Sequence, residues 1–360
     1  MKTRDFSFNL PEELIAQNPP AQRGDSRLFI LNPSAPPGTG EGYRWDHRKV
    51  SELVEIIEPG TVMVFNNSKV RRARIEGATA QGGRVEALLL ENRGEGTWAC
   101  LTNRSKKLKT GDMLTFPGGM RAQVGERDED LRLLHFKPSL DESYLELWGH
   151  IPLPPYMKRP DNDSDRNRYQ TVYAGPLGSA AAPTAGLHFT PELLGALEKK
   201  GVEIRFVTLH VGLGTFLPVR VENLENHRMH REIYSIPQET ADSVNKAKVE
   251  GRKILSVGTT SLRTLESAWV KENEWGKGHL PPGDGETSIF IYPGYDFSCV
   301  EQLFTNFHTP ESTLLMLVSA FAGKDHILKA YQEAVDQRYR FFSYGDSMLI
   351  LTRKLSTEHQ

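Results

Sequence analysis

Hydrophobic and polar positions follow two different patterns along the chain. Over residues 1–60 and 151–360, apolar residues at helical spacing alternate with short apolar runs that are typical of buried strands. The pattern predicts helices over 11–17, 48–57, 191–200, 237–250, 262–270, 310–321 and 326–337, and strands over 28–31, 203–210, 253–257, 287–292 and 347–351. Such alternation indicates a mixed-sheet α/β domain.

Residues 61–150 have a different pattern. After an apolar strand over 61–65, short β-rich runs are separated by turns that contain glycine. These runs cover 70–75, 84–90, 97–101, 112–116, 120–124 and 131–136, and a helix capped by Ser139 follows to Trp148. Six strands at this spacing predict a small antiparallel β-barrel. We therefore expect a multi-domain α+β protein, in which a barrel domain (61–150) is inserted into a discontinuous α/β domain (1–60 and 151–360).

Two unusual loops flank the helix expected to begin at Pro191. Their polar and glycine positions are Thr184, Gly186, His188, His210, Gly212, Gly214 and Thr215. Small residues let a ligand approach the backbone closely, so the loops are interpreted as a site. The Gly-x-Gly at 212–214 does not open a helix, as a dinucleotide-binding loop must, because an extended run with Pro218 follows it. The alternative is purely structural: tight turns with buried histidines.

Further polar motifs fall at the ends of the predicted apolar elements, where the loops of an α/β sheet gather. They are Asn66-Asn67-Ser68, Met229-His230-Arg231-Glu232, Val257-Gly258-Thr259-Thr260-Ser261-Leu262-Arg263, Tyr292-Pro293-Gly294-Tyr295 and Thr305-Asn306-Phe307-His308-Thr309-Pro310. Taken one at a time, each also has a structural interpretation. Thr259 or Thr260, for example, suits the N-cap of a helix.

Charge is unevenly distributed along the 360 residues. The formal net charge is -2, which does not fit a protein that coats nucleic acid with its whole surface. From Lys69 to Lys109, however, ten Lys and Arg face four Glu, a local charge of +6, so the rest of the chain carries -2 minus 6, or -8. The inserted block is therefore expected to face a polyanion.

The two cysteines, Cys100 and Cys299, have neither metal-ligand nor redox spacing, so a zinc site and a disulfide framework are both unsupported. The N-terminus lacks an apolar signal core, and the longest apolar run, around 314–322, is too short to span a bilayer. These features predict a soluble protein of the reducing cytoplasm.

Together and in this order, the motifs resemble the S-adenosylmethionine:tRNA ribosyltransferase-isomerase family of queuosine biosynthesis. The resemblance extends from Asp5-Phe6 to Phe342-Ser343-Tyr344-Gly345-Asp346, and the strings 181–189 and 208–216 are its most specific marks. Three positions depart from the family pattern. The Asn32–Gly42 stretch, expected to be a mobile surface loop, is longer; Thr309 replaces a leucine; and Asn103-Arg104-Ser105 replaces a turn like Pro-Gly.

The resemblance implies a reaction and its substrates. The ribosyl group of S-adenosylmethionine is transferred to the aminomethyl arm of 7-aminomethyl-7-deazaguanine at the tRNA wobble position and is isomerised, which gives epoxyqueuosine, adenine and methionine. No tightly bound cofactor and no metal are implied, since S-adenosylmethionine is a co-substrate. A monomer that contacts the tRNA anticodon loop and no membrane is expected.

The chemistry suggests roles for the candidate residues. A base must take a proton from the ribose methylene beside the sulfonium, and adenine needs a proton as it leaves. The candidates for proton transfer, which the sequence does not rank, are His188, His210, His308 and Glu232, with Asp346 as an orienting carboxylate. The candidates for substrate binding are Asn66, Asn67, Thr184, Gly186, Gly212, Gly214, Thr215, Thr259, Thr260, Arg263, Tyr292 and Asn306. Of these, Thr259, Thr260 and Arg263 suit a carboxylate or a phosphate.

The barrel supplies the expected phosphate contacts: Arg71, Arg72, Arg74, Arg104, Lys106, Lys107 and Lys109. Two other classes of protein stay open. An RNA-binding module without activity would explain the basic barrel but not the polar loops. A tRNA methyltransferase would use the same co-substrate but would release S-adenosylhomocysteine in place of adenine and methionine.

Overall fold

A large mixed β-sheet forms the centre of the computed structural model, which describes residues 1–33, 43–212, 221–271 and 278–351. Nine strands within those residues make up the sheet. Their order is β15 (Gly283–Thr287), β13 (Glu232–Ile236), β12 (Glu203–Leu209), β3 (Val62–Asn66), β14 (Ile254–Val257), β16 (Gln302–Asn306), β17 (Ser347–Ile350), β1 (Arg27–Pro33) and β2 (Tyr43–Lys49). The central strands β12, β3, β14 and β16 are parallel, whereas β13 and β17 run antiparallel to them.

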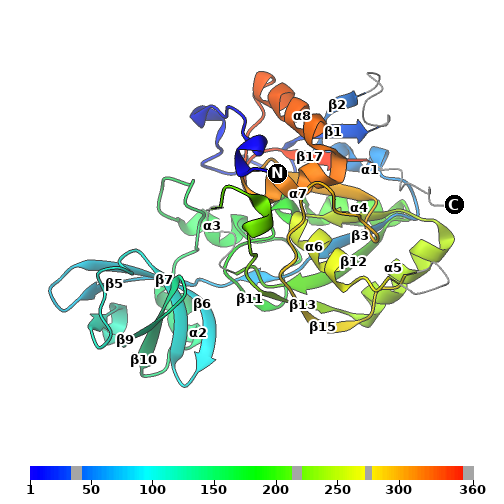
Figure 1. Cartoon of the computed structure of the whole chain (residues 1–360). Coiled ribbons are helices and arrows are strands. Elements are labelled where there is room, and N and C mark those ends of the chain that lie inside the picture. Colours follow the sequence, from blue (N-terminus) through cyan, green and yellow to red (C-terminus); the bar gives the residue numbers. More distant parts are fainter. Residues whose placement is uncertain (34–42, 213–220, 272–277, 352–360) are drawn as a thin grey trace.

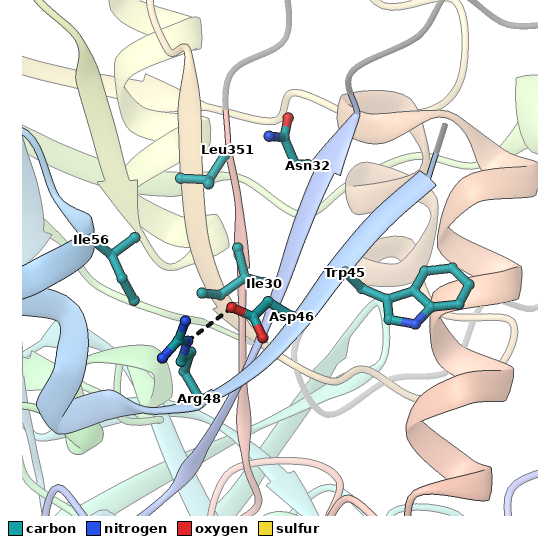
Figure 2. Close-up of a pocket in the computed structure, with 7 residues that line it drawn as sticks. All are labelled: Ile30, Asn32, Trp45, Asp46, Arg48, Ile56 and Leu351. Atoms are coloured by element: carbon teal, nitrogen blue, oxygen red, sulfur yellow. Dashed lines mark hydrogen bonds and ion pairs between the residues drawn. The ribbon is translucent and has the colours of Figure 1, made fainter. Parts of the chain in front are cut away.

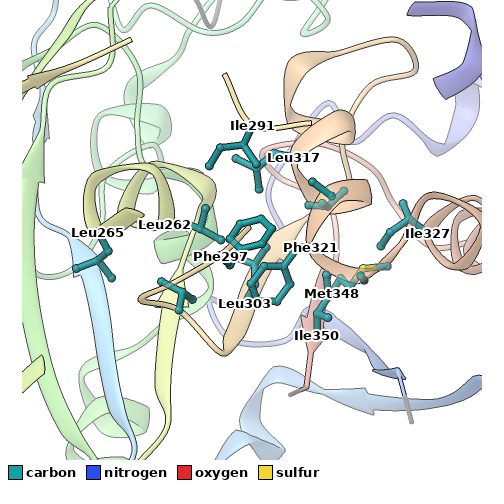
Figure 3. Close-up of a cluster of buried hydrophobic side chains, with 14 of the residues drawn as sticks. Leu262, Leu265, Ile291, Phe297, Leu303, Leu317, Phe321, Ile327, Met348 and Ile350 are labelled. Atoms are coloured by element: carbon teal, nitrogen blue, oxygen red, sulfur yellow. The ribbon is translucent and has the colours of Figure 1, made fainter. Parts of the chain in front are cut away.

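Helices cover both faces of this sheet (Figure 1). One face packs against α5 (Gln238–Glu250), α6 (Thr259–Ala268), α7 (Thr313–Ala322) and α8 (Lys324–Asp336), and the other against α1 (Leu53–Ile56) and α4 (Pro191–Lys199). Figure 3 shows the first core, in which side chains of α6, α7 and α8 meet those of the strands. Along β3, Val62 and Val64 enter this core while Met63 and Phe65 enter the other. Because both faces are buried, the strand is apolar throughout.

A closed antiparallel barrel forms a second lobe beside the sheet (Figure 1). It contains six strands, all within the described range 43–212: β10 (Leu131–Lys137), β7 (Thr97–Thr102), β6 (Arg84–Gly94), β5 (Arg74–Thr79), β8 (Met113–Thr115) and β9 (Arg121–Asp128). Helix α2 (Glu142–Trp148) packs against its core. The predicted fold class, a mixed-sheet α/β unit with an inserted small barrel, is confirmed.

The expected start of the inserted block at residue 61 is one strand too early. β3 pairs with β12 and β14 of the large sheet, so the barrel block begins after Asn66. Helix α2 also starts later than expected, because its N-cap is Asp141, whose carboxylate accepts from the Tyr144 N–H at 2.8 Å, and not Ser139. That the two units fold as separate domains stays a proposal.

Several other elements differ from the sequence pattern. β2, β13 and β16 were not expected, and β15 covers 283–287 in place of 287–292. The helix expected over 48–57 consists of the end of β2, a 3-10 turn η3 (Val50–Glu52) and the short α1, because residues 43–49 pair along β1. The helix expected over 11–17 is only a 3-10 turn, η2 (Glu12–Leu14). α6 begins at Thr259 because Gly258, with φ of 89°, turns the chain directly from β14 into the helix.

Other predictions are confirmed. The helix expected to begin at Pro191 is α4, and Pro191 is its first residue. Its N-cap is Thr190, whose hydroxyl accepts from the Leu193 N–H at 3.2 Å. α5 ends at Gly251, which is left-handed. The minor elements are η1 (Thr3–Phe6), β4 (Lys69–Val70), α3 (Asp163–Arg168), β11 (Leu177–Ser179), η5 (Thr184–His188) and η7 (Leu224–Asn226). Of the Asn32–Gly42 stretch, residues 34–42 lie outside the described residues. In the described part of the chain, no helix is long and apolar enough to cross a membrane.

Candidate active site at the carboxyl ends of the parallel strands

The sheet topology brings the polar motifs to one edge. The carboxyl ends of the parallel strands carry Asn66 on β3, His210 after β12 and Gly258 after β14. Because β13 and β17 run the opposite way, Glu232 and Asp346, at their amino ends, lie at the same edge. Motifs that are far apart in the sequence therefore meet where α/β proteins build their sites.

Asn66 joins the ends of two strands and a helix. Its side-chain NH₂ donates to the Leu209 carbonyl at 3.0 Å and to Thr260 Oγ1 at 3.3 Å. Its side-chain oxygen accepts from the N–H groups of Leu209 and Ser68 at 3.1 and 3.0 Å. All four hydrogen-bonding positions of this fully buried side chain are used. Asn66 therefore fixes β3, β12 and α6 relative to one another.

Arg263, in the second turn of α6, leaves donors unused. Its Nη1 contacts Glu232 Oε2 at 2.5 Å, and both side chains are buried. The Nε and Nη2 groups of Arg263 are buried and have no partner among the described residues. Within those residues no side chain caps the N-terminus of α6 at Thr259 either. Free guanidinium donors beside an uncapped helix N-terminus form a site for a carboxylate or phosphate.

His188 lies in a closed hydrogen-bond network. Asn306 Nδ2 donates to His188 Nε2 at 2.9 Å, so the ring proton is on Nδ1, which donates to Ser26 Oγ at 2.9 Å. The Thr184 hydroxyl donates to Asn306 Oδ1 at 3.2 Å, and Asn306 Nδ2 also donates to the Phe342 carbonyl at 3.2 Å. Burial lowers the pKa of His188 to about 3, so the ring is neutral. Both nitrogens are occupied, which gives this histidine a structural role in the unliganded protein.

His308 is bonded through one ring nitrogen, and Asp346 through both carboxylate oxygens. His308 Nε2 lies 3.0 Å from Thr305 Oγ1, and burial lowers the pKa of this histidine to about 3. The Asp346 carboxylate accepts from the backbone N–H groups of Arg27 and Arg340 at 2.9 and 2.8 Å, and burial raises its pKa. These contacts hold β1 and the segment before β17 in place and reach none of the three candidate histidines.

We expect acid to destabilise the fold through the two buried histidines. The unfolded chain binds a proton on each near pH 6.5, whereas His188 and His308 take one up only near pH 3. Stability is therefore complete above pH 6.5 and falls as the pH drops towards 3, by roughly 1 kcal/mol per pH unit for each histidine. Urea unfolding between about pH 7 and 5 measures this slope. His308→Gln should remove about half of it, and an unchanged slope would contradict the assignment.

His210 differs from the other two histidines. Its side chain is half-buried, and Nδ1 has no partner among the described residues. The ring packs on Gly178, where an added Cβ would lie 3.1 Å from Cε1 and Nδ1. Burial, together with the charge of Arg71, lowers the pKa of His210. A neutral imidazole with a free nitrogen is the state that a general base requires.

His210 and the Glu232–Arg263 pair are also close along the backbone. The N–H of His210 donates to the carbonyl of Ile233 at 3.2 Å, and Ile233 directly follows Glu232 on β13. A free imidazole and a buried guanidinium with unused donors therefore lie on neighbouring segments of one edge. These two groups are therefore the main candidates for chemistry at this edge.

The glycines of the two loops have different surroundings. At Gly186 an added Cβ would lie 2.0 Å from the hydroxyl oxygen of Tyr173, so only glycine fits there. At Gly212 an added Cβ would meet no atom of the described chain within 4 Å. Gly214 and Thr215 lie outside the described residues. Packing therefore accounts for Gly186, whereas no described atom crowds Gly212.

The remaining candidates for substrate binding are only partly free. Asn67 Oδ1 accepts from the Thr208 hydroxyl at 2.7 Å. Tyr292 packs against Phe290 with 5.1 Å between ring centroids, and the Tyr295 hydroxyl donates to the buried Glu266 at 3.4 Å. Among the described residues, neither tyrosine ring contacts His210. A substrate-binding role for Tyr292 therefore stays a proposal.

The basic residues of the barrel fall into two groups. Arg71, Arg72 and Arg74 are largely buried and form ion pairs with Glu142, Glu146 and Glu86 at 2.8, 3.9 and 3.3 Å. Arg104 is partly exposed, and Lys106, Lys107 and Lys109 are exposed. No salt bridge involves these last four within the described residues. We therefore propose RNA contacts for Arg104, Lys106, Lys107 and Lys109 only.

One hollow in the structure lies away from this cluster. It has a volume of about 680 Å³ and is lined by Ile30, Asn32, Trp45, Asp46, Arg48, Ile56 and Leu351 (Figure 2). It sits at the carboxyl end of β1, the opposite edge of the sheet from Asn66 and Arg263. Its charged groups, Arg48 and Asp46, pair with each other at 2.8 Å. A second hollow beside His188 has about 20 Å³, room for a single water.

Two residues of the site are absent from the predicted set. Ser26 holds the Nδ1 hydrogen of His188, and Gly178 lies under His210. A glycine in Leu177-Gly178-Ser179, just before the first unusual loop, was a usable signal. Ser26 had no such signal in the sequence, because it lies 162 residues from His188 and only the fold brings the two together. Among the described residues, no group of three or more His, Cys, Asp or Glu side chains is placed to hold a metal ion.

A mixed α/β sheet with imidazole, guanidinium and carboxylate groups at the carboxyl ends of its parallel strands belongs to the class of α/β enzymes. The sequence also matches the family model described as queuosine biosynthesis protein over residues 3–350. It is 48% identical to the S-adenosylmethionine:tRNA ribosyltransferase-isomerase of Treponema denticola, with 98% of this chain and 100% of the relative covered. It is 50% identical to that of Clostridioides difficile, with 97% and 100% covered.

A solved structure agrees with these relatives. The crystal structure of S-adenosylmethionine tRNA ribosyltransferase from Thermotoga maritima is 38% identical, with a TM-score of 0.53, and covers 96% of this chain and 100% of its own. The chain belongs to the queuosine biosynthesis family of S-adenosylmethionine:tRNA ribosyltransferase-isomerases and is a transferase.

Proposed function

We propose that this protein transfers the ribosyl group of S-adenosylmethionine to 7-aminomethyl-7-deazaguanine at the wobble position of tRNA and isomerises it, giving epoxyqueuosine-tRNA, adenine and methionine. The family supplies the reaction type. The observation that carries the assignment to this edge of the sheet is the pairing of His210, with a free ring nitrogen, and Arg263, with two free donors. One suits proton transfer and the other suits an anionic group of the substrate.

The proton count of the reaction defines what the site must do. The C–N bond to adenine and the C–S bond to methionine break, and a C–N bond to the aminomethyl nitrogen forms. Within the former ribose a new C–C bond closes the five-membered carbocycle, and the ring oxygen exchanges one C–O bond for another to become the epoxide oxygen. The amine and the ribose methylene each lose a proton, adenine gains one, and one is released to solvent. His210 is the candidate that takes the methylene proton, because its neutral ring has a nitrogen without a partner among the described residues.

The co-substrate's methionine end has a matching receptor. The carboxylate would lie against the Nε and Nη2 groups of Arg263 and the first N–H groups of α6, near Thr259 and Thr260. Glu232 accepts from the Nη1 group of Arg263, so the guanidinium is held in one orientation. No tightly bound cofactor is proposed. tRNA is the proposed partner of the barrel, and the protein is proposed to act as a monomer.

Incubation with S-adenosylmethionine and tRNA that carries the aminomethyl-deazaguanine should release adenine and methionine in equal amounts. Chromatography of the quenched reaction measures both. The control is the same tRNA with guanine at the wobble position, which lacks the aminomethyl arm and should release neither product. S-Adenosylhomocysteine in place of adenine would show a methyltransferase, and no turnover with intact tRNA binding would show an RNA-binding module.

A further inference from the structure

Residues 103–109, here named the basic loop, join β7 to β8 at one end of the barrel. The loop is compact: the N–H groups of Lys107 and Leu108 donate to the Arg104 carbonyl at 2.7 and 3.1 Å. Leu108 is 4% exposed and packs in the barrel core. The side chains of Lys106 and Lys107 are exposed on the outside. The backbone of the loop is thus shaped so that its cations point to solvent.

No Asp or Glu accompanies these cations within the loop itself. Residues 96–111 contain no Asp or Glu, and the first acid after them, Asp112, accepts the backbone N–H of Lys109 at 2.8 Å. By contrast, Arg84 and Arg93 elsewhere on the barrel are paired with acids at 2.5 and 3.0 Å. The basic loop therefore gathers positive charge that is available to a polyanion, in addition to single exposed cations such as Arg121 and Lys137 on β9 and β10.

A buried arginine lies beneath the loop and shapes it. Arg132 on β10 is 9% exposed. Its Nη2 donates to the carbonyls of Ser105 and Leu108, both at 3.0 Å, and its Nη1 to the carbonyl of Gly125 at 3.4 Å. Within the described residues no salt bridge involves Arg132. Its charge is held by backbone carbonyls alone, so it crosslinks the two halves of the loop to β9 without neutralising the loop's charge.

The loop lies at the barrel end away from the large sheet. The connection to the sheet is at the start of β5, where Arg74 and His150 exchange backbone hydrogen bonds at 3.3 and 2.7 Å. The basic loop is at the other end of β5, since a Cβ added to Gly83, in the β5–β6 turn, would lie 2.7 Å from Arg104 Nη1. A change in the loop should therefore alter RNA binding and not the chemistry.

We propose that Arg132 is a positioning residue for RNA: it does not touch phosphate itself but holds the basic loop in the shape in which Arg104, Lys106, Lys107 and Lys109 bind the phosphates of one backbone stretch. This role rests on the proposed function, in that tRNA is taken as the polyanion. The Nη2 group of Arg132 donates to two loop carbonyls at once, which an aliphatic side chain cannot do. Preorganisation of this kind lowers the ordering cost of binding.

The test measures tRNA affinity against salt for the full-length wild type and for Arg132→Met. Four phosphate contacts predict a log-log slope of roughly -3 for the wild type. Arg132→Met should reduce that slope by about 1 and weaken binding about 5- to 8-fold at about 0.1 M salt. Amide hydrogen exchange at Lys107 and Leu108 should become faster. Arg132→Lys, which keeps the charge and donors, should recover most of the slope.

Two controls separate positioning from other effects. Arg93→Met removes one positive charge from the barrel without touching the loop, and Leu134→Ala weakens the barrel core on the same strand as Arg132. Both should keep the wild-type slope. An unchanged slope in Arg132→Met, or an equal loss in either control, would overturn the role of Arg132. A wild type that binds no tRNA would instead overturn the proposed function. Amide hydrogen exchange at Lys107 and Leu108 would still show whether Arg132 shapes the loop.

Discussion

Replacement of His210 by glutamine should lower the turnover of S-adenosylmethionine by about 10²- to 10⁴-fold, the range typical of a lost general base. Glutamine is similar in size, so the packing on Gly178 is kept while the basic nitrogen is lost. tRNA affinity should be unchanged, because the exposed cations lie on the barrel. Single-turnover adenine release measures the chemical step, and a filter-binding titration with tRNA measures affinity.

The pH dependence offers a second measurement on the same residue. Burial and the charge of Arg71 lower the pKa of His210, so the base stays neutral below the ordinary histidine pKa of 6.5. The acid limb of the rate profile should therefore lie below pH 6.5. An acid limb at or above this value would contradict the assignment of His210 as the base.

His188→Gln and His308→Gln are the matched controls. The His188 ring is hydrogen-bonded to Ser26 and Asn306, and the His308 ring is hydrogen-bonded to Thr305. These variants should lose stability and keep the chemical step within about 10-fold of wild type wherever they are folded. A folded His188→Gln protein with turnover as low as that of His210→Gln would transfer the role of base to His188.

Most of the fold could be predicted because its central strands and helices carry local signals. β3 and β12 are apolar runs, and α4 has its cap and first-turn proline in sequence. β2 could not be predicted in this way. Its residues, Tyr43 to Lys49, are mostly charged or polar, and they become a strand only because they pair with β1 at the edge of the sheet. β16 was missed because its five residues have no flanking turn signal of their own.

The candidate site shows the same limit at the level of side chains. The sequence presents three histidines as equals. Only the fold shows that side chains bond the rings of His188 and His308, while Nδ1 of His210 has no partner among the described residues. Likewise Arg71 and Arg72 appear as phosphate contacts until α2 brings Glu142 and Glu146 to them. Ion pairs across 70 or more residues are set by tertiary structure and leave no local pattern.

Arg263→Lys should raise the KM for S-adenosylmethionine by about 10- to 100-fold with little change in kcat. Lysine can keep the contact with Glu232 as a point charge, but it cannot also present a fork to the methionine carboxylate. A hydrogen bond to a charged group is worth about 1.5–3 kcal/mol, which matches that change in KM. The carboxylate is remote from the reacting bonds, so the variant should bind the ground state and the transition state more weakly by the same amount. The control is Arg252→Lys, which should have the wild-type KM. Arg252 is also an ion-paired arginine, but it lies beside Gly60, near the amino end of β3.

Glu232→Gln then decides between the two roles open to this carboxylate. Its Oε2 is taken by Arg263, so we expect it to orient the guanidinium and not to move a proton. The amide still accepts a hydrogen bond but no longer attracts the cation, so KM for S-adenosylmethionine should rise about 10-fold at nearly constant kcat. In the double variant Glu232→Gln/Arg263→Lys the effects should be less than additive, because both act through one fork. A fall in kcat of about 10²-fold or more at unchanged KM would contradict this and make Glu232 a proton-transfer group.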